Sequence, residues 1–213
     1  GVSAKRSVLH YQKTASGAYY TISEDGGFWR CSRFIDDSVS FLNAESPKVM
    51  EEAGRAFGEF QRYLSDYPVQ KLHIAIPHFH NTVMRYETFR RSIREDSCRR
   101  AEDAAPEIER FFRLEDIATK MYKMQRRGEL PLRVTHNDTK CSNILFDKDS
   151  LQHLSVIDLD TVMPGLVGFD FGDAIRSGAN TGAEDERDIR NVSVDMEKFE
   201  AFTRGFIGAV CES

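Results

Sequence analysis

The sequence lacks the features that mark membrane, secreted and zinc-ribbon proteins. No apolar run approaches the roughly 18 residues that a membrane-spanning helix needs, and the first residues, GVSAKRSVLHYQ, hold no apolar core of signal-peptide length. The four cysteines form no CxxC pair, which argues against a zinc ribbon or a disulfide framework. Basic residues are not in excess, since 29 Lys and Arg face 34 Asp and Glu, a formal net charge of −5. We therefore expect a cytoplasmic globular protein that binds neither nucleic acid nor a membrane.

The first patterned segment predicts a β-hairpin. Residues 18–23 and 28–35 favour strands, and the turn Glu24-Asp25-Gly26-Gly27 between them is rich in residues that tolerate tight turns. We expect Tyr20 and Trp29 to pack in the core of this hairpin. The short acidic segment Asp36-Asp37-Ser38 that follows indicates a connector between two lobes.

The rest of the chain alternates helices with short strands. Apolar residues at helical spacing predict a first helix that Ser46 caps and Pro47 begins. The predicted helices cover residues 47–64, 82–94, 103–127 and 196–210, and the predicted strands cover 132–134, 144–146 and 155–157. Because the strands are short and separated by helices without a repeating unit, this order indicates an α+β fold.

Residues 135–173 carry the clearest chemical pattern, which begins with His136-x-Asp138-x-Lys140-x-x-Asn143. Phosphoryl transfer needs a carboxylate that orients and deprotonates the acceptor hydroxyl, a positive group near the moving phosphoryl group, and ligands for a metal ion. Asp138 lies early in a loop between two predicted strands and suits the role of base. Lys140 can neutralise charge that develops on the phosphoryl group. The pattern therefore predicts a phosphotransferase loop.

The metal ligands are predicted directly before the first and directly after the second of two neighbouring strands. Asp158 follows Asn143 by 15 residues, and the strands between them form a hairpin that brings both oxygens together. Neutral and anionic oxygens of this kind suit Mg²⁺. Asp158-Leu159-Asp160 alone is also typical of a glycosyltransferase DxD motif, but the preceding loop disfavours that reading. The triplet Asp170-Phe171-Gly172 matches the kinase DFG metal motif, yet it begins 27 residues beyond Asn143, too far for the same hairpin.

These patterns resemble the catalytic and metal-binding loops of the kinase-like aminoglycoside phosphotransferase family. Within it, six stretches resemble the N-acetylhexosamine 1-kinases in the same order: DGGFWRCSRFID, AGRAFGEFQRYLSDYP, IPHFHNT, LPLRVTHNDTKCSNILFD, VIDLDTVMPG and FDFGDAIRSGANT. The resemblance implies a two-lobed, protein-kinase-like α+β fold with ATP as co-substrate and Mg²⁺ as cofactor. It implies transfer of the γ-phosphoryl group to the anomeric hydroxyl of N-acetylglucosamine or N-acetylgalactosamine, which gives the sugar 1-phosphate.

The same resemblance assigns further roles. Three residues are placed at the hinge that contacts the nucleotide: Arg33, Phe34 and Ile35. Asp170 is expected to hydrogen-bond backbone near the catalytic loop, and His136 to support that loop by packing. Asp138 is expected to contact the acceptor. Asp160 stays open between a metal ligand and a contact to the sugar.

The resemblance also divides the chain. Residues 1–37 correspond to the remnant of a nucleotide-binding small lobe that ends at the hinge, and residues 38–213 to a helical large lobe that is incomplete at its C-terminus. Before the hinge we find neither a glycine-rich loop nor a strand lysine paired with a helix glutamate, both of which such kinases need. We therefore expect an internal fragment that is inactive by itself.

Several alternatives remain open. One alternative is that the acceptor is another small hydroxylated metabolite, such as an aminoglycoside, choline or homoserine. The other is that the chain is a non-catalytic kinase-like binding remnant. His78 and His80 form a His-x-His pair of the kind that binds zinc, but no companion ligand lies near them, so a structural role is expected. The sequence does not indicate the oligomeric state.

Overall fold

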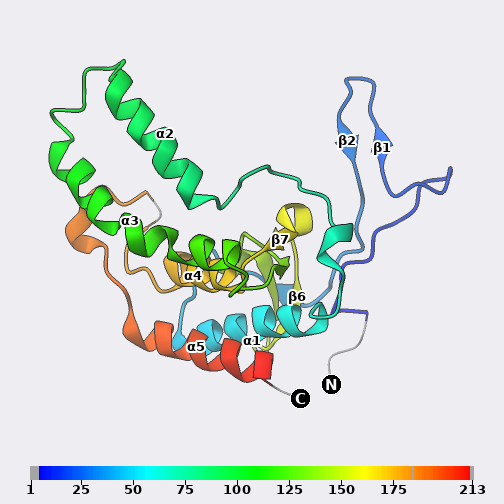
Figure 1. Cartoon of the computed structure of the whole chain (residues 1–213). Helices are drawn as coiled ribbons and strands as arrows, with labels where there is room; N and C mark the ends of the chain where they lie inside the picture. The colour runs from blue at the N-terminus through cyan, green and yellow to red at the C-terminus, as the bar shows by residue number, and fades with distance from the viewer. Residues whose placement is uncertain (1–4, 184, 212–213) are drawn as a thin grey trace.

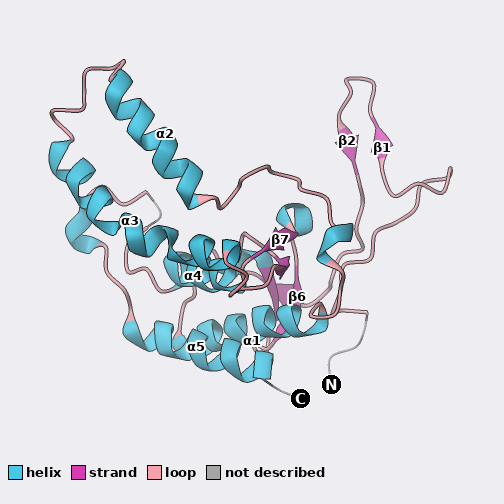
Figure 2. Cartoon of the chain, viewed as in Figure 1, coloured by secondary structure: helices cyan, strands magenta, loops and turns pink. Residues whose placement is uncertain are grey.

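The computed structural model describes residues 5–183 and 185–211, which form helices and short antiparallel strands (Figures 1 and 2). The helices are α1 (Pro47–Tyr63), α2 (Thr82–Glu95), α3 (Ala105–Arg126), α4 (Val167–Gly178) and α5 (Met196–Cys211). The strands are β1 (Thr21–Ile22), β2 (Phe28–Trp29), β3 (Ser38–Val39), β4 (Arg133–Thr135), β5 (Ile144–Asp147), β6 (His153–Val156) and β7 (Met163–Gly165). This mixture agrees with the predicted α+β class.

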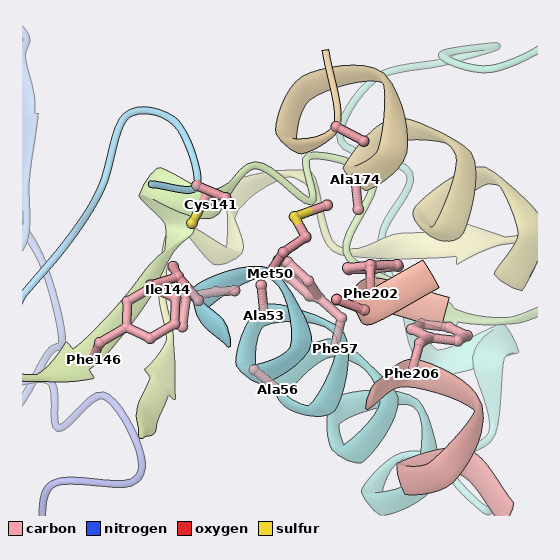
Figure 3. Close-up of a cluster of buried hydrophobic side chains, with 14 residues drawn as sticks. Met50, Ala53, Ala56, Phe57, Cys141, Ile144, Phe146, Ala174, Phe202 and Phe206 are labelled. Atoms are coloured by element: carbon pink, nitrogen blue, oxygen red, sulfur yellow. The ribbon is translucent and has the colours of Figure 1, made fainter. Parts of the chain in front are cut away.

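Helix α1 begins where the sequence predicts and forms the centre of the helical layer. The Ser46 side chain caps it by accepting a hydrogen bond from the Val49 amide, and Pro47 occupies the first turn, where its missing N–H has no cost. Its apolar stripe packs against α5, which lies alongside it at the bottom of Figure 1. The buried core between α1, α5 and the β5 strand includes Met50, Phe57, Phe146, Phe202 and Phe206 (Figure 3).

Glycines allow α1 and α5 to approach closely. A Cβ atom built on Gly205 would lie 2.1 Å from the Glu51 carbonyl oxygen, and one built on Gly54 would lie 2.3 Å from the Phe202 carbonyl oxygen. Both obstacles are helix backbone, which cannot move away as a flexible side chain does. The contact between the two helices therefore depends on the missing side chains.

We expect Gly205→Ala to destabilise the protein by about 1–3 kcal/mol, the usual cost of overpacking a core. Gly208 on the same helix is the matched control, because a Cβ there would meet no atom within 4 Å. Gly208→Ala should stabilise the protein by up to about 1 kcal/mol, since alanine is the better helix former. Urea unfolding of the two variants measures both effects, and equal midpoints would contradict the packing argument.

Two small sheets bring the catalytic-loop residues together. Strand β5 pairs with β3 and β6, with Ile144 opposite Val156, while β4 pairs with β7, with Thr135 opposite Met163. The segment between β4 and β5 is thereby fixed at both ends. This is the segment that carries the predicted base and the first predicted metal ligand.

The structure departs from the sequence expectations in several places, and strands β3 and β7 are among the elements that were not predicted. Helix α4 was not predicted, because its sequence VGFDFGDAIRSG holds three glycines and two aspartates, which have low helix propensity. The hairpin of β1 and β2 forms, but the expectation that Tyr20 and Trp29 pack in its core is wrong: they are 53% and 63% exposed on a ribbon that stands away from the helices (Figure 1). No helix in the described ranges is long and apolar enough to cross a membrane.

Candidate active site

The predicted catalytic loop, residues 136–143, joins β4 to β5, and its first residues are held by side chains. The amides of His136 and Asn137 donate to the two carboxylate oxygens of Asp170, at 2.9 and 2.8 Å. The amide of Thr139 donates to Asp173 at 2.9 Å. Because these backbone groups have side-chain partners in place of strand or helix partners, the first part of the loop has one defined shape, and Cys141–Asn143 then form a single 3-10 turn.

His136 is fully buried at the start of the loop and connects it to the neighbouring hairpin. Its Nε2 lies 2.9 Å from the Ile157 carbonyl oxygen, and its Nδ1 lies 3.3 Å from the Asp138 amide nitrogen. A carbonyl only accepts and an amide N–H only donates, so the imidazole is neutral with its proton on Nε2. Burial lowers the pKa of His136, which agrees with the neutral form. The structure thus places His136 as a buried bridge behind the loop.

Asp170 lies on α4 and points into the protein, away from the cleft described below. Its side chain is 1% exposed and accepts, besides the two loop amides, a hydrogen bond from Gln61 Nε2 at 2.8 Å. Burial raises the pKa of Asp170 to about 6, against the opposing effect of these three hydrogen bonds, so the group is a carboxylate at neutral pH. Of the two aspartates considered as metal ligands, Asp158 therefore lines the cleft and Asp170 does not.

A direct hydrogen bond joins the side chains of Asp138 and Asn143 within the loop. The Asn143 amide nitrogen donates to both the backbone carbonyl and the Oδ2 atom of Asp138, at 2.9 Å each. The Lys140 ammonium lies 4.0 Å from the other carboxylate oxygen, Oδ1. Both Asp138 and Lys140 side chains are about one-third exposed, so the carboxylate is oriented by the protein and still open to a ligand.

The predicted metal ligands meet at one end of the β5–β6 hairpin. The Ile157 amide donates to the Asn143 carbonyl at 2.9 Å, which places Asp158 next to Asn143 in space. Since the Asn143 nitrogen bonds Asp138, its amide oxygen points the other way, and no hydrogen bond to that oxygen occurs among the described residues. With the exposed Asp158 carboxylate it offers the hard oxygen donors that Mg²⁺ prefers. The residues present therefore fit Mg²⁺.

Asp160 points toward the hairpin that carries β2. Its carboxylate forms an ion pair with Arg30, whose guanidinium lies over the Tyr11 ring at 5.0 Å from the centroid. Both partners are half exposed, at 47% and 62%, so the pair contributes little to stability by itself. It joins residues 130 positions apart across the cleft described next.

A cleft of about 330 Å³ opens between the N-terminal hairpin and the catalytic hairpins. The predicted hinge residues Arg33, Phe34 and Ile35 line one side, and the other side is lined by Leu145, Ile157 and Asp158. The Ile35 side chain is buried, whereas that of Phe34 is 78% exposed. The cleft thus joins an apolar wall, which suits the flat face of an aromatic base, to the predicted metal ligand, which suits a metal-bound anionic tail.

Three supporting residues were missed by the sequence analysis. Gln61 is a buried polar residue on the apolar face of α1, which is the signal that would have identified it. Thr161 donates from Oγ1 to the His136 carbonyl at 2.7 Å, and Asp173 accepts from Thr139. The last two lie on exposed or mixed segments whose pattern does not distinguish them from ordinary surface residues.

The loop, the neighbouring Asn143 and Asp158 and the cleft lined by the predicted hinge residues sit on an α+β fold. The chain belongs to the phosphotransferase enzyme family APH, whose sequence model matches residues 8–202. The fold is similar to that of Plasmodium vivax ethanolamine kinase, with a TM-score of 0.52 and 16% sequence identity over 96% of this chain and 54% of that one. The chain thus spans about half the length of that kinase. The predicted fold class and the family are confirmed.

Proposed function

We propose that this chain carries the catalytic core of an ATP-dependent kinase that phosphorylates a hydroxyl group of a small molecule. The observation that carries the proposal is that Asp158 lines the 330 Å³ cleft, while the Ile157–Asn143 and Asn143–Asp138 hydrogen bonds connect it to the predicted base. Bound to the Asn143 and Asp158 oxygens, Mg²⁺ would neutralise the β- and γ-phosphates of ATP. The proposal includes residues 1–37 as the nucleotide side of the cleft and residues 38–213 as the catalytic side.

Within this proposal the two oxygens of Asp138 have different tasks. Oδ2 is occupied by the Asn143 amide, while Oδ1 faces Lys140 and is the oxygen that takes the proton of the acceptor hydroxyl. Lys140 stands beside that oxygen as a positive group for the transferred phosphoryl. Because Asn143 bonds the base and presents its own oxygen to the metal, it couples the position of the nucleotide to that of the acceptor.

We propose an N-acetylhexosamine as the acceptor, phosphorylated at its anomeric hydroxyl. The sequence stretches IPHFHNT and LPLRVTHNDTKCSNILFD support this acceptor through their resemblance to N-acetylhexosamine 1-kinases. A small amino alcohol is the second candidate, since the solved structure with the similar fold bears the name ethanolamine kinase. Choline, homoserine and an aminoglycoside complete the panel of acceptors.

A panel assay decides between these acceptors. The natural polypeptide that contains this chain is incubated with Mg²⁺ and ATP and each acceptor in turn, and the products are examined by phosphorus NMR. The expected product is a sugar 1-phosphate, recognised by coupling of the phosphorus to the anomeric proton. Turnover with an amino alcohol alone would overturn the sugar assignment. Nucleotide binding without turnover on any acceptor would indicate a non-catalytic binding module.

The metal site gives an independent test that needs no turnover. Asp158→Asn should weaken Mg²⁺-dependent ADP binding about tenfold or more, because it removes the negative charge from the proposed metal site formed by the Asn143 and Asp158 oxygens. Asp149→Asn, in the exposed turn between β5 and β6, is the matched control and should bind as the parent does. Isothermal titration calorimetry with and without Mg²⁺ measures both. Equal affinities in the two variants would contradict the role of Asp158.

A further inference from the structure

One peptide group in the catalytic loop is held from both sides by histidines. It joins Asn137 to Asp138: the Asp138 N–H donates to His136 Nδ1, and the Asn137 carbonyl lies 3.3 Å from His80 Nε2. Since the carbonyl only accepts, His80 Nε2 carries a proton and donates it. The orientation of this peptide sets the direction in which the Asp138 side chain leaves the backbone.

His80 is itself fixed by two aromatic rings. Its imidazole centroid lies 4.4 Å from that of Phe79 and 5.4 Å from that of Phe169, which precedes the buried Asp170 on α4. His80 lies in the connection between α1 and α2, within the stretch IPHFHNT. The ring therefore reaches the catalytic loop from a segment outside the β4–β7 hairpins and has little freedom to turn away.

The peptide needs an external support because its backbone is strained. Asn137 has a φ of 66°, in the left-handed region, which asparagine tolerates better than most residues but which still disfavours an L-residue. The neighbouring carbonyls have partners of their own: His136 accepts from Thr161 at 2.7 Å and Asp138 from Asn143 at 2.9 Å. For the Asn137 carbonyl, the donor within the described residues is His80.

We propose that His80 is a positioning residue of the phosphotransfer reaction. By donating to the Asn137 carbonyl it keeps the Asn137–Asp138 peptide in the orientation that presents Asp138 Oδ1 to the acceptor. Its role is thus neither packing alone nor zinc binding, and no group of three or more potential metal ligands occurs among the described residues. The inference rests on the proposed function for its catalytic consequence, but the hydrogen bond itself is testable without catalysis.

Two variants of His80 separate the effect of its N–H donor from the effect of its aromatic ring. His80→Phe keeps an aromatic ring between Phe79 and Phe169 without a donor, and His80→Gln restores an N–H donor close to the position of Nε2. The control is His73→Phe, an exposed histidine in the same connection. Amide exchange of the loop, followed by NMR in the 213-residue chain, should be about five- to tenfold faster at Asp138 in His80→Phe, as loss of one hydrogen bond implies. It should approach the parent rate in His80→Gln.

The catalytic consequence is measured in the natural polypeptide that contains the chain. His80→Phe should lower kcat about ten- to a hundredfold with the KM for ATP changed less than about twofold, because the base is displaced while the nucleotide cleft is intact. His80→Gln should recover most of this loss. Unchanged amide exchange in His80→Phe would overturn the proposal, and so would equal kcat losses in the Phe and Gln variants. Absence of turnover in the parent would count against the proposed function, and the exchange comparison would still decide the role of His80.

Discussion

Replacing Asp138 by asparagine is expected to lower kcat by about 10²- to 10⁴-fold, the usual contribution of a general base. The variant retains the carbonyl oxygen that can accept the Asn143 hydrogen bond now made to Oδ2. It loses the ability to take a proton at Oδ1. The loop should therefore keep its shape while the chemical step fails. Steady-state kinetics with the preferred acceptor, in the natural polypeptide that contains the chain, measures the change.

Binding must be measured beside turnover to give this result its meaning. Mg²⁺-dependent ADP affinity should change less than about threefold in Asp138→Asn, because Asn143 and Asp158 rather than Asp138 are the proposed metal ligands. Asp149→Asn is again the matched control for the loss of one carboxylate charge. Undiminished turnover in Asp138→Asn would remove Asp138 from the role of base. A parallel loss of ADP binding would show that Asp138 acts on the nucleotide instead.

Whether a feature could be predicted from the sequence depends on how far apart in the chain its interacting residues lie. Helix α1 was predicted because a proline and an apolar stripe lie within one segment of 17 residues that a capping serine directly precedes. The meeting of Asn143 and Asp158 was predicted because a single hairpin connects them. Contacts made by residues far apart in sequence, such as Arg30 with Asp160 or His80 with the Asn137 carbonyl, leave no local pattern.

The candidate active site illustrates the same limit. Asp138, Lys140, Asn143 and Asp158 were identified because each residue type matches one requirement of phosphoryl transfer at a spacing that a loop or hairpin explains. Whether they perform these roles stays a prediction. Most of the supporting network leaves no local pattern: Gln61 is marked only as a polar residue on the apolar face of α1, and its hydrogen bond to Asp170 is visible only in the structure. The chemistry is thus local in sequence, whereas the groups that hold it in place are distributed.

Because the supporting groups are distributed along the chain, we expect the largest effect on stability from Asp170, a residue that is proposed to contact no substrate. Asp170→Ala leaves three buried donors, the amides of His136 and Asn137 and the Gln61 side chain, without their acceptor. An unsatisfied buried polar group costs about 1–3 kcal/mol, so the variant should lose about 3 kcal/mol or more of unfolding free energy. Asp170→Asn retains one acceptor oxygen and should lose roughly half as much.

Urea unfolding at neutral pH measures these losses, and Asp116→Asn on α3 is the control. Its carboxylate is fully exposed and, among the residues that the structure describes, pairs with Lys123 alone, so it should change the unfolding free energy by less than about 0.5 kcal/mol. A loss in Asp170→Ala no larger than that of the control would mean that the loop keeps its shape without Asp170. The expected order, Ala below Asn below parent, would instead show that the buried Asp170 carboxylate organises the loop that carries the predicted base. The triplet Asp170-Phe171-Gly172 would then mark a support of the loop that carries the predicted base.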